Sequence, residues 1–270
     1  MQNLHTHCTF CDGKDTPEQM IEAAIEKGFT SIGFSSHSYA FFSELREYSI
    51  TAEKEPLYFS EIRALQKKYE GKIDIFLGLE FEMYSQCSLL GYDYLIGSVH
   101  YLKKGDTYLG FDRDAATVKA IIDNHYDGDG MKYAEAYYEA MCELPKHGRF
   151  DIIGHYDLIT KHAETHDFFD MHSKKYREYA ITALETLKGK IPFFEVNTGA
   201  IGRGYRTTPY PEKSLLCEFR RLGFGAVITS DCHDRTFLDC YRKESEELLR
   251  AAGFRELYIL TKDGFQPEKL

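Results

Sequence analysis

Residues 226–233 read Ala-Val-Ile-Thr-Ser-Asp-Cys-His, a short apolar run that ends directly in a carboxylate and an imidazole. A nearly continuous apolar run bounded by polar residues is typical of a parallel strand that is buried on both faces. Asp231 and His233 lie two residues apart, so in an extended chain both side chains point the same way. The stretch therefore predicts a buried strand that presents two possible metal ligands at its carboxyl end.

The same pattern recurs along the chain. Seven apolar runs are predicted as strands: residues 3–5, 31–35, 73–79, 94–99, 151–154, 191–196 and 226–229. Six of these ends carry His, Asp or Glu: His5 and His7, His37, Glu80 and Glu82, His100, His155, and Asp231 with His233. The carboxyl ends of the strands in a parallel barrel all meet at one face, where active sites lie. We therefore expect these side chains to converge.

Segments of helical period separate the apolar runs. Thr16-Pro17-Glu18-Gln19 predicts a helix start with a capping box and a proline at the first helical position. Further helices are predicted at residues 57–69, 115–124, 132–144, 174–187, 212–222 and 237–252, with a last short strand at 256–261. Seven strand–helix units predict an α/β fold, either a closed barrel or a doubly wound open sheet. We favour a TIM-like (β/α)7 barrel, because its geometry gathers the polar strand ends.

Composition narrows the class of protein. The 270 residues include 33 Lys and Arg against 43 Asp and Glu, a formal net charge of −10, which argues against a general nucleic-acid binder. No apolar run approaches the ~20 residues that cross a bilayer, and the first residues do not resemble a signal peptide. The seven cysteines, an odd number, are interpreted as reduced thiols. We expect a single cytoplasmic domain over residues 1–270 that contacts neither nucleic acid nor membrane.

A metal centre is the favoured interpretation of the strand ends. A lone His-x-His pair carries little weight, but six of the eleven histidines fall at predicted strand ends together with Glu80 and Asp231. Burying so many titratable groups together is costly unless cations compensate them. Imidazoles with carboxylates suit Zn, Mn or Fe. The other five histidines are expected to be solvated or structural: His125, His147, His162, His166 and His172.

The motifs, in order, resemble the PHP (polymerase and histidinol phosphatase) superfamily, and in particular its monofunctional, metal-dependent histidinol-phosphate phosphatases. They are HTH at 5–7, Asp12, SSH at 35–37, GLE at 78–80, GSVH at 97–100, GHYDL at 154–158, EVNTG at 195–199 and TSDCH at 229–233. The resemblance implies a distorted (β/α)7 barrel that holds three divalent metal ions.

The resemblance also implies a ligand set for each ion. His5, His7, Glu80 and Asp231 would hold the first ion; Glu80, His100 and His155 the second; Asp12, His37 and His233 the third. The place of Asp12 rests on the resemblance, since an aspartate before Gly13 is otherwise an ordinary turn residue. Glu82 is the alternative bridging carboxylate and is expected to have a supporting role. Among the ligands, Glu80, Asp231 and His233 are the expected catalytic residues.

Clustered divalent ions suit hydrolysis of a phosphate monoester, with a metal-activated hydroxide that attacks phosphorus. Arg203, between glycines, is the expected phosphate ligand, and Arg206 is its competitor. Lys161 could supply a second cation, although Thr160 stands where the family suggests arginine. Glu82, Asp112 and Asp157 are open alternatives for binding an amine or imidazole. Residues 102–131 are expected to form part of a lid or rim.

The leading hypothesis is hydrolysis of L-histidinol phosphate to L-histidinol and inorganic phosphate, a step of histidine biosynthesis. Three alternatives stay open. The first is a phosphoesterase that acts on a sugar phosphate, nucleotide or phosphotyrosine. The second is a metal-dependent amidohydrolase, and the third is a metal-storage or processivity module. The expected partner is a small phosphomonoester, and the sequence leaves the oligomeric state open.

Overall fold

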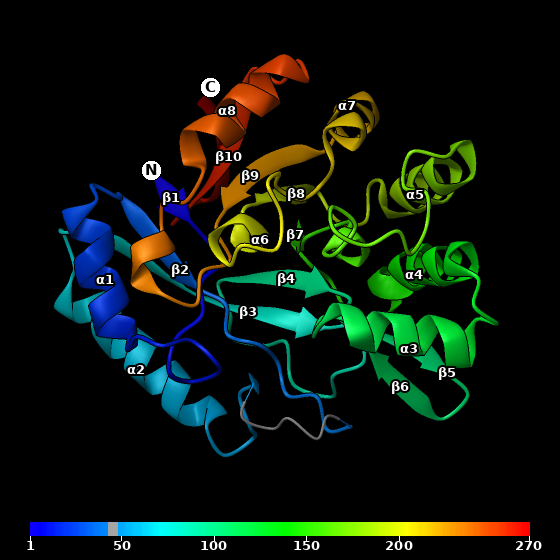
Figure 1. Cartoon of the computed structure of the whole chain (residues 1–270). Coiled ribbons are helices and arrows are strands. Elements are labelled where there is room, and N and C mark those ends of the chain that lie inside the picture. Colours follow the sequence, from blue (N-terminus) through cyan, green and yellow to red (C-terminus); the bar gives the residue numbers. More distant parts are fainter. Residues whose placement is uncertain (43–47) are drawn as a thin grey trace.

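Seven parallel strands form the centre of the molecule in a computed structural model that describes residues 1–42 and 48–270 (Figure 1). The sheet order is β1-β2-β3-β4-β7-β8-β9, and every neighbouring pair is parallel. The strands are β1 (Gln2–Asn3), β2 (Ser31–Phe34), β3 (Asp74–Glu82), β4 (Tyr94–Ser98), β7 (Ile152–Ile153), β8 (Phe193–Asn197) and β9 (Gly225–Thr229).

The sheet curls until its two edges meet. Thr6 and Cys232 form a parallel bridge, with the His7 amide donating to the Cys232 carbonyl at 2.9 Å. This contact links the chain after β1 to the chain after β9, so the ring is nearly closed. The predicted (β/α)7 barrel is therefore confirmed, and the open sheet is not observed.

Helices surround this ring (Figure 1). The α-helices are α1 (Pro17–Glu26), α2 (Glu55–Lys68), α3 (Ala115–His125), α4 (Gly130–Glu143), α5 (Lys174–Leu187), α6 (Gly199–Gly202), α7 (Lys213–Leu222) and α8 (Arg242–Ala251). Short 3-10 turns occur at η2 (Leu144–Lys146), η3 (Leu158–Thr160) and η4 (Arg235–Phe237). The capping box predicted for α1 is present: Thr16 and Gln19 bond to each other's backbone. No helix of the described residues is long and apolar enough to span a membrane.

Several boundaries differ from the sequence prediction. The first strand stops at Asn3, because beyond it Thr6 contacts Ser35 and Cys232 instead of continuing a regular ladder. The helix predicted at 237–252 begins only at Arg242, since Tyr241 adopts a left-handed backbone conformation that interrupts it. The strand predicted at 256–261 is β10 (Glu256–Thr261), and it pairs with an unpredicted antiparallel partner, β11 (Gly264–Lys269).

The segment between β4 and β7 contains an insertion. An antiparallel hairpin, β5 (Tyr101–Lys104) and β6 (Thr107–Gly110), leaves the barrel directly after His100 and is followed by α3 and α4. The amide of Phe111 donates to the His100 carbonyl at 3.2 Å, so the hairpin returns to the carboxyl end of β4. The end of the hairpin thus lies at the barrel rim, while a lid or rim formed by the whole of residues 102–131 stays a prediction.

Two packed regions support the strand ends. Helices pack against the outside of the barrel, and a smaller cluster around Leu4, Tyr94 and Ile96 fills the inside. The Tyr94 hydroxyl donates to the Leu4 carbonyl. Glycines leave room for this side chain, since a β-carbon would lie 2.4 Å from its hydroxyl oxygen at Gly33 and 2.2 Å from its ring at Gly78. This inner cluster fills the barrel below the polar ends of its strands.

Candidate metal centre

Glu80, near the end of β3, lies at the middle of the polar cluster with its side chain fully buried. Its Oε2 atom lies 3.2 Å from His5 Nε2, 3.5 Å from His7 Nε2 and 2.7 Å from His37 Nδ1. These histidines come from the chain after β1 and after β2. Three separate segments thus direct nitrogen and oxygen donors at one point.

The other oxygen of Glu80 faces a second group. Oε1 lies 2.8 Å from His155 Nε2 and 3.3 Å from His100 Nε2, and these two nitrogens are 3.2 Å apart. Glu82, two residues along the same strand, accepts hydrogen bonds from both the backbone amide and the ring Nδ1 of His100. That contact turns the Nε2 of His100 towards Glu80. Glu80 therefore faces two imidazole groups with its two oxygens, while Glu82 orients one of the rings.

Asp231 follows β9 and has a positive φ of 44°, which is unusual for a residue other than glycine. Its Oδ1 lies 3.2 Å from His7 Nε2 and 3.6 Å from His5 Nε2. Arg203 donates to its Oδ2 at 3.1 Å and to its carbonyl at 2.8 Å. These contacts fix the strained backbone in place, as is common at functional sites.

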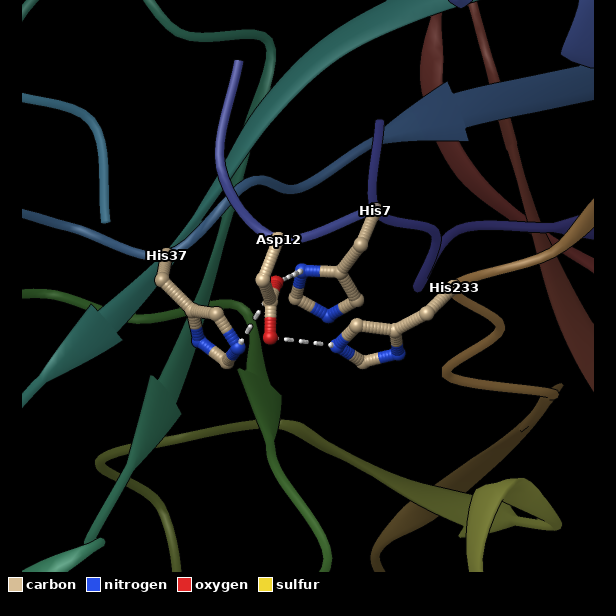
Figure 2. Close-up of side chains that lie close together, drawn as sticks. All are labelled: His7, Asp12, His37 and His233. Atoms are coloured by element: carbon tan, nitrogen blue, oxygen red, sulfur yellow. Dashed lines mark ion pairs between the residues drawn. The ribbon is translucent and has the colours of Figure 1, made fainter. Parts of the chain in front are cut away.

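Asp12 completes the cluster from the loop after β1. Figure 2 shows its carboxylate between the rings of His7, His37 and His233. The nearest nitrogens of these rings lie 3.9, 3.7 and 3.2 Å from its oxygens, respectively. The loop is tight: the amides of Cys11 and Gly13 both donate to the Cys8 carbonyl. Asp12 belongs to no predicted strand. The folded-back loop nevertheless places its side chain in the mouth of the barrel.

The donor set fits divalent cations. In the described part of the chain, three groups bring possible ligand atoms within 4.8 Å of one another: His7, Asp12, His37 and His233; His5, His7 and Glu80; His37, Glu80 and His100. Four buried donor atoms here have no hydrogen-bond partner: His5 Nε2, His7 Nε2, Asp12 Oδ1 and Glu80 Oε2. Buried polar atoms normally have partners, so atoms left free at a shared point match what an ion would coordinate.

The electrostatics keep the carboxylates of the cluster ionised and shift the pKa values of its histidines in both directions. Burial would raise the pKa of Glu80, but the charges of His5 and His37 outweigh it and hold the pKa well below its usual range. The pKa of Asp231 is likewise held low, with Arg203 as the strongest opposing charge to burial. Burial and the neighbouring histidines lower the pKa of His7 to about 3. The carboxylates are thus ionised and His7 is neutral at pH 7. Although burial opposes them, the neighbouring carboxylates raise the pKa values of His5, His37 and His100, so these histidines would release a proton on coordination.

Glu195, in β8, is the functional residue that the sequence prediction did not assign. Its buried carboxylate accepts from His5 Nδ1 at 2.8 Å and from the backbone amide of His155 at 2.6 Å. It also accepts from Asn197 and from Thr229, each at 2.8 Å. Glu195 therefore orients two of the predicted ligands, His5 and His155, from the side that faces away from Glu80. The detectable signal was a charge inside an otherwise apolar strand.

Two thiols lie beside the cluster. Cys8 and Cys11 are both buried, and burial raises the pKa of each, to about 11 for Cys8 and further for Cys11. The Cys11 sulfur lies 3.4 Å from His7 Nδ1, on the opposite side of the ring from Glu80. As a protonated thiol, Cys11 interacts weakly with the ring of His7, whereas Cys8 pairs with the hydroxyl of Ser36.

Comparisons with known proteins match this arrangement. Residues 3–199 match the model of the PHP domain. The chain belongs to the PHP domain family. It is 27% identical over 241 residues to a protein of Deinococcus radiodurans named "Probable histidinol-phosphatase", covering 85% of each chain. It is 26% identical over 249 residues to the histidinol-phosphatase of Bacillus subtilis, covering 85% of this chain and 92% of the relative.

A solved structure shares the PHP fold. The histidinol phosphate phosphatase of Lactococcus lactis, complexed with zinc, L-histidinol and phosphate, superposes with a TM-score of 0.74 at 22% identity and covers 98% of both chains. The predicted family is therefore confirmed. All nine predicted ligands of this PHP domain lie in one cluster at the carboxyl ends of the strands: His5, His7, Asp12, His37, Glu80, His100, His155, Asp231 and His233.

The predicted cations of the PHP barrel occupy different positions. Arg203 lies at the edge of the metal centre, against Asp231, with about 30% of its side chain exposed. Arg206 is buried away from solvent and donates to the carbonyl and hydroxyl of Thr160 and to the Thr208 hydroxyl. Arg206 therefore ties two loops together, which leaves Arg203 as the arginine that a ligand at the metals can reach.

Lys161 is also at the mouth, but its ammonium is already bound. It donates to the carboxylate of Asp112 at 2.8 Å and to the Asp112 carbonyl at 2.6 Å, and it lies 4.4 Å from the centre of the Tyr205 ring. Only 9% of its side chain is exposed. The contact joins the β4–β7 insertion to the loop after β7.

Proposed function

We propose that this PHP domain hydrolyses L-histidinol phosphate to L-histidinol and inorganic phosphate. The observation that carries the proposal is the convergence of five imidazoles on the two oxygens of buried Glu80. Asp12, Asp231 and His233 lie around these rings, and a partly exposed arginine lies at the edge. A cluster of this kind suits phosphate monoesters. The histidinol-phosphatase names of relatives that match 85% of the chain support this substrate over other monoesters.

We assign three divalent ions, Zn, Mn or Fe, to the centre. His5, His7, Glu80 and Asp231 would hold the first, Glu80, His100 and His155 the second, and Asp12, His37 and His233 the third. Bound there, divalent ions would lower the pKa of water and stabilise the charge that builds up on phosphoryl oxygens. The zinc in the related Lactococcus lactis structure supports a metal of this type.

Each proposed catalytic side chain has a defined task. Glu80 joins two ligand groups, because its oxygens face different imidazoles. Asp231 holds the first group against Arg203, and His233 lies on the open side against Asp12. Arg203 uses part of its five N–H donors on Asp231, and the remaining donors would grip phosphate oxygens.

Phosphate release across a substrate panel tests the proposal. L-histidinol phosphate would be compared with a sugar phosphate, a nucleotide, phosphotyrosine and p-nitrophenyl phosphate, using enzyme with defined Zn, Mn or Fe content. We expect kcat/KM to be highest for L-histidinol phosphate by at least about tenfold. We also expect strong chelation to abolish activity and added metal to restore it. A value no better than that for p-nitrophenyl phosphate refutes the substrate, and full activity without metal refutes the chemistry.

A further inference from the structure

Besides Glu195, which is fully buried behind His5, three carboxylates stand near the metal centre without being among the proposed ligands, and they differ sharply in access. Glu82 has 6% of its side chain exposed and spends one oxygen on two donors of His100. Asp157 is fully buried, and its Oδ2 accepts from the backbone amide of Glu212. Asp112 has 35% of its side chain exposed. Only Asp112 of these three can meet a ligand that enters from solvent.

The position of Asp112 is set by the return of the β5–β6 hairpin. The preceding residue, Phe111, bonds to the carbonyl of His100, so Asp112 lies at the rim beside a proposed metal ligand. Although burial opposes them, the positive charges of Lys161 and Arg203 lower the pKa of Asp112, so the group is ionised at neutral pH.

Lys161 holds Asp112 from one side. The ammonium contacts Oδ1 and the main-chain carbonyl of Asp112 and rests on the Tyr205 ring, largely out of solvent. A carboxylate offers about four acceptor sites on its two oxygens, so Oδ2 keeps its capacity. Lys161 is therefore a positioning residue, which fixes a negative group at the mouth instead of offering a free positive one.

We propose that Asp112 binds the ammonium group of the substrate through Oδ2 and so gives the enzyme its preference for a phosphate ester that carries an amine. The inference rests on the proposed function, because it assumes that the phosphate group sits at the metal centre beside Arg203. A small ester bound there extends towards the rim, where Asp112 is the accessible anion. A charge-assisted hydrogen bond selects ligands that have the donor and leaves a carboxylate partly unpaired with those that lack it.

The test compares two substrates on the metal-loaded enzyme: L-histidinol phosphate and its deamino analogue, 3-(imidazol-4-yl)propyl phosphate. The measured quantity is the ratio of their kcat/KM values. We expect Asp112→Asn to lower this ratio by about 10- to 100-fold, the range for a hydrogen bond to a charged group, with kcat/KM for the deamino analogue changed less than about threefold. Asp112→Glu, which keeps the charge, should recover most of the preference.

Asp106→Asn is the matched control, since it removes the same charge from the exposed turn of the same hairpin. Its ratio should equal that of the wild type. An unchanged ratio in Asp112→Asn, or a Glu variant that discriminates no better than the Asn variant, overturns the proposal. So does an equal loss on both substrates, which indicates a purely structural role. Failure of the proposed function is seen separately, in a wild-type enzyme that does not prefer L-histidinol phosphate to p-nitrophenyl phosphate.

Discussion

Glu195 determines which nitrogen of His5 carries a proton, and replacing it with glutamine tests the centre from behind. An ionised carboxylate only accepts hydrogen bonds, so Nδ1 of His5 must be the donor in their 2.8 Å contact. In the neutral form of His5 that binds a metal, the Nε2 lone pair then faces Glu80 and Asp231. Four donors converge on the two oxygens of Glu195, two on each. Glutamine has one oxygen and one amide group, and therefore cannot satisfy all four.

The hydrogen bonds that remain possible in Glu195→Gln place the proton of His5 on the nitrogen that should bind the metal. Its oxygen must stay with the backbone amide of His155, which can only donate, and with the amide group of Asn197, whose oxygen already accepts from the Gly199 amide. Its amide then faces His5, which must accept at Nδ1 and carry its proton on Nε2, where it cannot bind a metal. Loss of such an outer partner typically lowers metal affinity 10- to 100-fold. That corresponds to about 1.4 to 2.7 kcal/mol of binding free energy.

The assay is chelator competition with metal analysis, followed by kcat at saturating metal. Thr229→Val is the matched control, because it removes another hydrogen bond to the same Glu195 oxygen without altering the proton on His5. We expect Glu195→Gln to weaken metal binding at least tenfold and Thr229→Val to change it less than about threefold. Metal affinity within twofold of the wild type in Glu195→Gln, or an equal loss in both variants, would refute the reasoning.

Three other substitutions test the remaining roles. His5→Ala should lose metal and phosphatase activity together; a variant that keeps its full metal content by elemental analysis contradicts the ligand assignment. Arg203→Ala should keep its metals and raise KM for phosphate substrates by about tenfold or more, and metal loss would show that Arg203 acts mainly through Asp231. Burial raises the pKa of Asp157 from 3.8 to about 6, so its contribution to stability is present below pH 4 and is lost as the pH rises through 6. Asp157→Asn should therefore stabilise the fold at pH 8, by up to about 3 kcal/mol, and hardly at pH 4, as measured by chemical unfolding.

The strands were predictable because burial on both faces leaves nearly unbroken apolar runs, and the convergence of their ends follows from parallel closure. The lengths of the strands were harder to predict. β1 is shorter than predicted because the barrel closes through Thr6 and Cys232, a contact between distant parts of the chain. The prediction of Asp12 as a ligand depended on the family resemblance, because it is the folded-back loop that places this residue at the barrel mouth. Glu195 was missed because attention to strand ends overlooks a charge that points inward from within a strand.

The charges around the centre bear on the number of ions. Five carboxylates face the imidazole cluster directly or through one histidine: Asp12, Glu80, Glu82, Glu195 and Asp231. Arg203 offsets one of them, and the pair of Lys161 and Asp112 is neutral. With neutral histidines, about four negative charges remain, and such an excess is costly in a buried site. Two divalent ions would cancel it and leave nothing to attract an anion. A third leaves an excess of two positive charges, which equals the charge of a phosphate monoester dianion and makes the occupied site neutral.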